Sequence, residues 1–128
     1  MPFVEFSESD FLRGKIVTPA WYRVHIDNST EALAKNGEST NYVMEGTIVR
    51  NSDDGTTDFT GVPLTWNFNS KAKGFMIGFF NALGVELAPG KRYELANSVG
   101  NEIDIFVEND TYDGRLINRI NHKYRTAR

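Results

Sequence analysis

Alternation of apolar and polar residues predicts that most of this chain folds into β-strands. In residues 21–26, the apolar side chains Tyr22, Val24 and Ile26 fall on one side of an extended chain, and this side is expected to face the core. Further strands are expected over residues 42–49, 62–69, 103–108 and 115–124. The stretches between them are rich in Asn, Asp, Gly and Thr, which favours loops and turns.

One segment has helical rather than strand periodicity. Residues 71–83 repeat apolar side chains at helical spacing, with Ser70 placed as an N-cap and Gly84 as the stop. Gly74 and Gly78 lie four residues apart, which favours a close approach of this helix to the sheet. Residues 3–6 are interpreted as a short strand that runs into a capped turn at residues 7–10.

Length and composition indicate one ordinary domain over residues 1–128, with 1–15 as an N-terminal arm. The chain has 128 residues, 40% of them apolar, which is enough for a core without covalent crosslinks. It has no cysteine, which excludes disulfides and thiolate-bound metal. No apolar run approaches the roughly 20 residues of a membrane span, and the acidic start lacks a signal-peptide pattern. We therefore expect a cytoplasmic protein that does not contact a membrane.

The charges are distributed unevenly along the chain. Residues 115–128 hold five Lys or Arg and no acid, whereas the preceding residues hold nine bases and seventeen acids. A net charge of −3 thus divides into +5 and −8, and this asymmetry favours an anionic partner. Arg115, Arg119 and Lys123 share one face of the last expected strand. Each lies about 13 Å from the next, at roughly 3.3 Å per residue. Residues 125–128 are interpreted as a basic frayed end.

The order of strands and helix is that of a five-stranded OB-fold barrel, with one helix between strands three and four. Several short motifs also resemble a family of phage-encoded, OB-fold, single-stranded DNA-binding proteins. They lie at residues 19–26, 64–68, 81–85, 89–91, 103–107, 112–115 and 118–120. The resemblance implies a DNA-coating protein of phage replication or recombination, with DNA preferred over RNA and replication or recombination proteins as further partners. It supplies no catalytic motif, and the basic end of this chain differs from the acidic tail of well-known bacterial single-strand binders.

Aromatic and basic residues provide the candidate contacts for a single strand, which needs stacking platforms and a positive surface. Trp21 is the first choice for stacking, with Arg23 and His25 on the same outward side, although Trp21 could instead cover the rim of the barrel. Phe106 points away from the aliphatic side of its strand and could stack a base or form a homodimer contact. Tyr112 could stack a base or fix its hairpin. Trp66 shares parity with Leu64 and Phe68, which favours a place in the core. The expected contacts are Trp21, Arg23, His25, Phe106, Tyr112, Arg115, Arg119 and Lys123. A solvated face is the alternative for Arg115, Arg119 and Lys123.

No motif indicates catalysis, a metal site or a cofactor. His25 and His122 are the two imidazoles, and neither has the spacing of a metal or nucleophile motif. The acids in residues 53–58 could suggest a metal-dependent nuclease, but such a composition is typical of a connecting loop. The main hypothesis is therefore a non-enzymatic single-stranded DNA-binding protein. A carbohydrate-binding or virion-associated β-module is the first alternative, and a protein adaptor the second.

Overall fold

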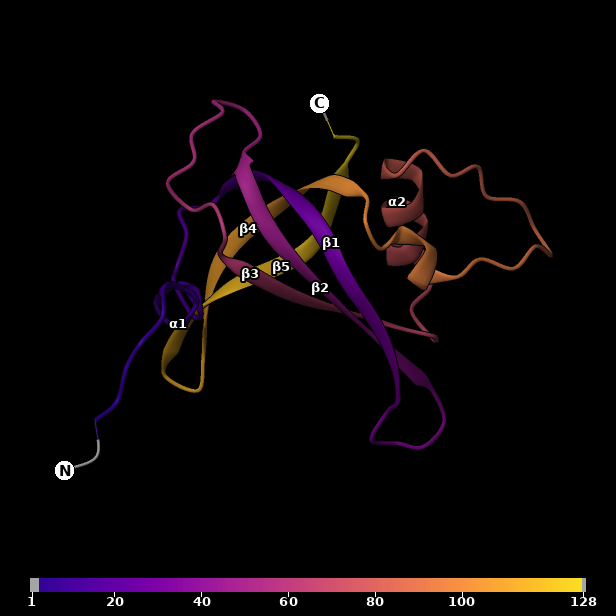
Figure 1. The fold of residues 1–128 in the computed structure, drawn as a ribbon. Coiled ribbons are helices and arrows are strands. Elements are labelled where there is room, and N and C mark those ends of the chain that lie inside the picture. The colour runs from indigo at the N-terminus through magenta and orange to yellow at the C-terminus, as the bar shows by residue number, and fades with distance from the viewer. Residues whose placement is uncertain (1–2, 128) are drawn as a thin grey trace.

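The computed structural model describes residues 3–127 as one antiparallel sheet with few helices (Figure 1). The strands are β1 (Ala20–Leu33), β2 (Thr40–Asn51), β3 (Pro63–Asn69), β4 (Glu102–Tyr112) and β5 (Arg115–Arg125). The helices are α1 (Glu8–Leu12), α2 (Gly74–Ala82) and the 3-10 turn η1 (Leu95–Ser98). The prediction of a mainly β protein with five strands and a helix between the third and fourth is confirmed.

The sheet is strongly coiled, and its two edges come close without joining. Its strand order is β3-β2-β1-β4-β5, so β3 and β5 are the edge strands. Phe68 on β3 nevertheless lies with its ring centroid 6.1 Å from that of Tyr124 on β5. Within residues 3–127 this edge contact is made by side chains and not by a backbone ladder.

Strand pairing is irregular at three places, and an extra residue at such a place increases the local bend and twist of a strand. Asp27 is the extra residue where the β1–β2 register shifts, beside Gly46. A Cβ on Gly46 would lie 2.6 Å from Val24 Cγ1 and 2.9 Å from the His25 carbonyl oxygen, so the strands can approach here only with glycine. On β5, residues 121–123 lie opposite the single residue Phe106, and His122 has a φ of 57°.

The core lies inside the coiled sheet and beneath α2. Tyr22, Val24 and Ile26 are buried as predicted, and Trp66 is also in the core. The Trp66 indole N–H has no hydrogen-bond partner in the described structure, which is consistent with an apolar site. Phe79 of α2 packs its ring 5.2 Å from Phe68 and seals this end of the core.

Helix α2 begins three residues later than predicted. Lys73 is its N-cap, and the hydroxyl of Ser70 instead accepts a hydrogen bond from the Thr40 backbone N–H at 2.9 Å. The stop at Gly84 is confirmed, because its φ of 81° suits glycine. The interpretation of Gly74 and Gly78 is wrong, since a Cβ on either would meet nothing within 4 Å outside the helix itself.

The two ends of the chain also differ from expectation. Residues 3–6 do not form a strand, whereas Ser7 and Asp10 do form the capping box that begins α1. Arg125 belongs to β5 and has three hydrogen-bond partners, so the prediction of a frayed end is wrong for this residue. Arg128 lies outside the described residues. No helix in the described part of the chain is long and apolar enough to cross a membrane.

Candidate nucleic-acid interface

Two aromatic rings and two cations form a continuous row on the outer face of β1, β4 and β5. Trp21 and Phe106 are direct cross-strand partners, with ring centroids 5.5 Å apart in an edge-to-face arrangement. The guanidinium of Arg125 lies 4.4 Å from the Trp21 ring, and Lys123 Nζ lies 5.3 Å from the Phe106 ring. We call these four residues the aromatic row, in the order Arg125, Trp21, Phe106 and Lys123.

Strand pairing explains why residues distant in sequence meet here. Trp21 and Phe106 each have the opposite parity to the buried apolar residues of their strands, so both rings point away from the core. The two rings are partly exposed. The irregular segment 121–123 of β5 faces Phe106, and it places Lys123 against the ring. The row therefore depends on three strands and on the local irregularity of β5.

A buried polar network beside Trp21, at the next cross-strand pair on the same face, holds Arg125 in place. The carboxylate of Asp104 is fully buried, and it accepts hydrogen bonds from Arg23 Nε at 2.7 Å, from Arg125 Nε at 3.4 Å and from the Ser52 hydroxyl. Arg125 also donates to Asp53 at 2.5 Å. Because a buried carboxylate needs compensating charges, Asp104 fixes two guanidiniums, one of which covers the Trp21 ring.

The expectation that Arg23 presents its charge at the surface is wrong. It lies on the outward parity as expected, but it is only 5% exposed and pairs with Asp104, with Glu102 also 3.7 Å away. The loop after β2 covers this part of the strand, as the backbone hydrogen bond from the Ser52 N–H to the Trp21 carbonyl shows. Arg23 therefore supports the network rather than presenting a charge at the surface.

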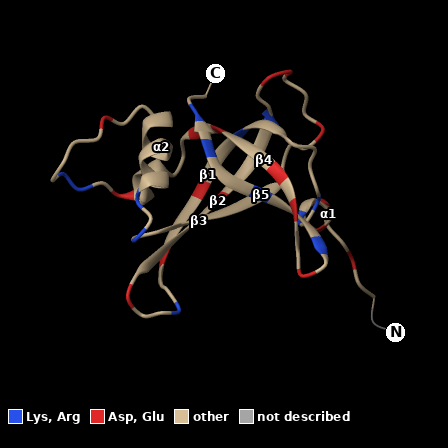
Figure 2. Cartoon of the chain, turned by 180° about the vertical axis from the view of Figure 1, so that it is seen from behind, with Lys and Arg blue, Asp and Glu red and all other residues tan. Residues whose placement is uncertain are grey.

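The three predicted bases of β5 are exposed, and acids from β4 accompany two of them. Arg119 pairs with Asp110, and Lys123 Nζ lies 3.1 Å from Glu108 Oε1. The pKa of the Asp110 carboxyl is lowered by a hydrogen bond from the Thr111 backbone N–H and also by Arg119. In Figure 2 red and blue segments accordingly lie together over the β4–β5 part of the sheet. This face is therefore of mixed charge.

The remaining candidate residues lie away from the aromatic row. His25 Nδ1 lies 2.9 Å from Asp27 Oδ1, farther along β1. Tyr112 and Arg115 pair with each other at the β4–β5 hairpin, where Tyr112 is 73% exposed. The turn between them has positive φ at Asp113 (54°) and Gly114 (77°), as expected for a two-residue hairpin turn. Tyr112 and Arg115 extend the surface along the hairpin, His25 lies apart from them on β1, and none of the three joins the row.

Arg125 and Asp104 are the participants that sequence analysis missed. The position of Asp104 along its strand was the signal that could have found it, because Asp104 shares the outward parity of Phe106. Its cross-strand partner on β1 is Arg23. Within residues 3–127, no group of three or more His, Asp or Glu is placed to hold a metal ion. No protein-family model matches this sequence, and a comparison with curated proteins finds no matching relative.

Proposed function

We propose that this protein is a non-enzymatic single-stranded DNA-binding protein. The aromatic row is the observation that carries the proposal. Nonspecific single-strand binding combines aromatic faces, on which bases stack, with cations that neutralise phosphates. Trp21 and Phe106 lie 5.5 Å apart, and a cation lies at each outer end.

The neighbouring bases give the row a direction. Arg119 and Arg115 continue along β5 from Lys123 toward the hairpin, where Tyr112 is exposed. We propose that a strand runs along β5, with bases on Trp21 and Phe106 and phosphates near Lys123, Arg119 and Arg115. Glu108 and Asp110 compete with those phosphates, so binding exchanges an internal ion pair for a contact with DNA.

The order and curvature of the strands support an open variant of the OB fold. The order β3-β2-β1-β4-β5 is what an OB barrel gives when its contact between the third and fifth strands is left unpaired. The preference for DNA over RNA, a role in phage replication or recombination, and the host cytoplasm as location rest on the sequence resemblance. The absence of catalysis is part of the same proposal.

Titration of intrinsic fluorescence with oligo-dT and with a matched blunt duplex tests this function. We expect quenching by oligo-dT, weaker binding of the duplex, and an affinity that falls with salt, with a slope near −0.7 for each phosphate neutralised. Equal affinity for both DNAs, or no binding at low salt, contradicts the proposal. Salt-independent binding of an oligosaccharide would favour the carbohydrate-binding alternative.

A further inference from the structure

The N-terminal arm exposes several large apolar side chains that its own domain does not cover. Phe3 is 90% exposed, Phe6 67% and Phe11 71%. In Figure 1 the residues before α1 project away from the sheet, whereas α1 lies beside it with Leu12 packed against the core. Clustered exposed apolar residues are typical of an interaction site. The arm, defined here as residues 3–12, therefore has the composition of a docking segment.

An open apolar groove of about 770 Å³ lies between α2 and the segment that follows it. Its walls come mainly from Met76, Ile77 and Phe80 on the helix and from Leu87 and Tyr93 on the following segment. The Tyr93 hydroxyl accepts a hydrogen bond from the Ala88 N–H at 2.8 Å, which bends this segment into the second wall. Ile77 is 51% exposed, so part of the apolar lining is open to solvent.

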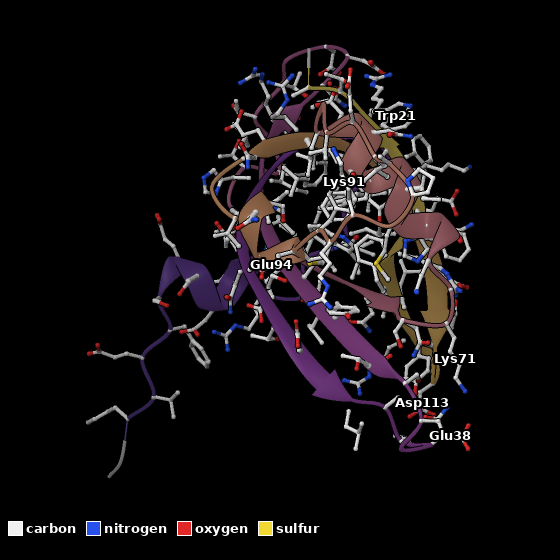
Figure 3. The ribbon with its side chains drawn as sticks, turned by 90° about the vertical axis from the view of Figure 1, so that its right-hand side faces the viewer. Trp21, Glu38, Lys71, Lys91, Glu94 and Asp113 are labelled. Atoms are coloured by element: carbon white, nitrogen blue, oxygen red, sulfur yellow. The ribbon has the colours of Figure 1, made fainter. Side chains whose placement is uncertain are left out.

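Charge complementarity matches the arm to the groove. Residues 3–12 carry three acids, Glu5, Glu8 and Asp10, and no base. Residues 70–93 around the groove carry four bases and one acid, Glu86; Glu94 follows directly, and Lys71 is already paired with Glu38 at 3.1 Å, so a smaller surplus of positive charge remains. The bases are Lys71, Lys73, Lys91 and Arg92. Figure 3 shows Lys71 and Lys91 on the side of the molecule that carries α2.

The arm and the groove of one molecule lie on different sides of the sheet. In Figures 1 and 3 the arm leaves the domain on the side away from α2. We propose that the arm of one copy of this chain docks in the α2 groove of a second copy. The phenylalanines fill the apolar lining, and the acids of the arm meet Lys73, which lines the groove, and the nearby Lys91 and Arg92.

This contact joins two different surfaces, so it can repeat. A head-to-tail contact forms a ring if its rotation closes and an extended chain if it does not. Such self-association would support continuous coating of a single strand, yet it needs no DNA. The proposal thus goes beyond the proposed function, and its test in the absence of DNA can fail or succeed independently.

Sedimentation velocity of the full chain without DNA provides the first test. The wild type should show a weight-average sedimentation coefficient that rises with protein concentration and falls with salt. Variant Phe3→Ser/Phe6→Ser in the arm and variant Ile77→Glu in the groove should each remain monomeric. Leu33→Ser is the matched control, because Leu33 is 74% exposed at the far end of β1 and should leave association unchanged. A wild type that is monomeric throughout the concentration range overturns the proposal.

Mixing the two variants tests the pairing itself. The arm variant keeps an intact groove and the groove variant keeps an intact arm, so their mixture should form a complex of one copy of each. A mixture that stays monomeric overturns the proposal. Lys73→Glu, at an exposed position, should also weaken association, and unchanged association overturns the predicted charge pairing. If Ile77→Glu associates like the wild type but binds oligo-dT more weakly, the groove contacts DNA and the proposal is wrong.

Discussion

Arg125 lies over the ring of Trp21, with 4.4 Å between the guanidinium carbon and the ring centroid, and the buried Asp104 helps to hold it there. Cation–π contacts of this kind contribute roughly 0.5–2 kcal/mol, depending on solvent exposure. The arrangement leaves Trp21 partly exposed, with Arg125 against its ring and Phe106 at its edge. The face on which a base is proposed to stack thus depends on a carboxylate that never reaches the surface.

Replacing Asp104 by alanine should destabilise the fold strongly. The change leaves Arg23 and Arg125 without their shared buried acceptor, and loss of one partner from a buried ion pair costs about 3–5 kcal/mol. Asp53→Asn is the matched control, because Asp53 contacts Arg125 from an exposed position and its loss should cost at most about 1 kcal/mol. Urea denaturation measures both values. Similar midpoints for the two variants would show that the buried network is not a major source of stability.

The two tryptophans should respond differently to truncation. Trp21→Ala should weaken oligo-dT binding by roughly 1–3 kcal/mol with the fold intact, because a stacking platform is lost. Trp66→Ala should instead lower the free energy of unfolding by about 3–5 kcal/mol, because Trp66 is 3% exposed in the core. Binding and denaturation are measured on both variants. Unchanged binding by folded Trp21→Ala would remove Trp21 from the interface.

Removal of the acids that accompany β5 should strengthen DNA binding. In Glu108→Gln/Asp110→Asn, Lys123 and Arg119 lose their internal partners and become available to phosphates. We expect tighter binding and a salt slope steeper by about 0.7 for each base that gains a phosphate. Glu31→Gln/Glu45→Gln is the control, since it removes the same charge from exposed positions on β1 and β2. Equal slopes for the two double variants would place the phosphates elsewhere.

His122 should make stability depend on pH. Burial lowers the pKa of its imidazole, and the ring stacks 4.4 Å from Phe75 and lies 2.8 Å from the Tyr124 hydroxyl through Nδ1. The unfolded chain, with a histidine pKa of about 6.5, therefore binds a proton at a higher pH than the folded protein does. The stability that depends on neutral His122 is therefore complete above a pH of about 6.5, and it is lost as the pH falls toward the lower pKa of the folded protein.

The measurement for His122 is the difference in thermal stability between the wild type and His122→Asn as a function of pH. Asparagine tolerates the positive φ at this position, and the titration of carboxylates is common to both proteins. The wild type should lose its advantage as the pH falls below about 6.5. A difference that stays constant with pH would show that His122 does not change its protonation on unfolding.

Local sequence determined the order of the strands and the helix, and which side of β1 carries the apolar core residues. Alternation in β1 placed Tyr22, Val24 and Ile26 in the core, and Gly84 ended α2, because side-chain period and backbone φ are local properties. The same parity pointed Trp21 and Phe106 outward. These predictions needed no knowledge of which strands are neighbours.

Tertiary structure decided which outward side chains become a site. Strand pairing placed Asp104 between Arg23 and Arg125. Arg23, expected at the surface, is therefore buried, and Arg125, expected in a frayed end, belongs to the aromatic row. The irregular residues 121–123 then set Lys123 against Phe106. Alternation along one strand carries no information on register across strands or on the acid that will neutralise a base. Those features depend on contacts between residues distant in sequence, and they follow only when the sheet is assembled.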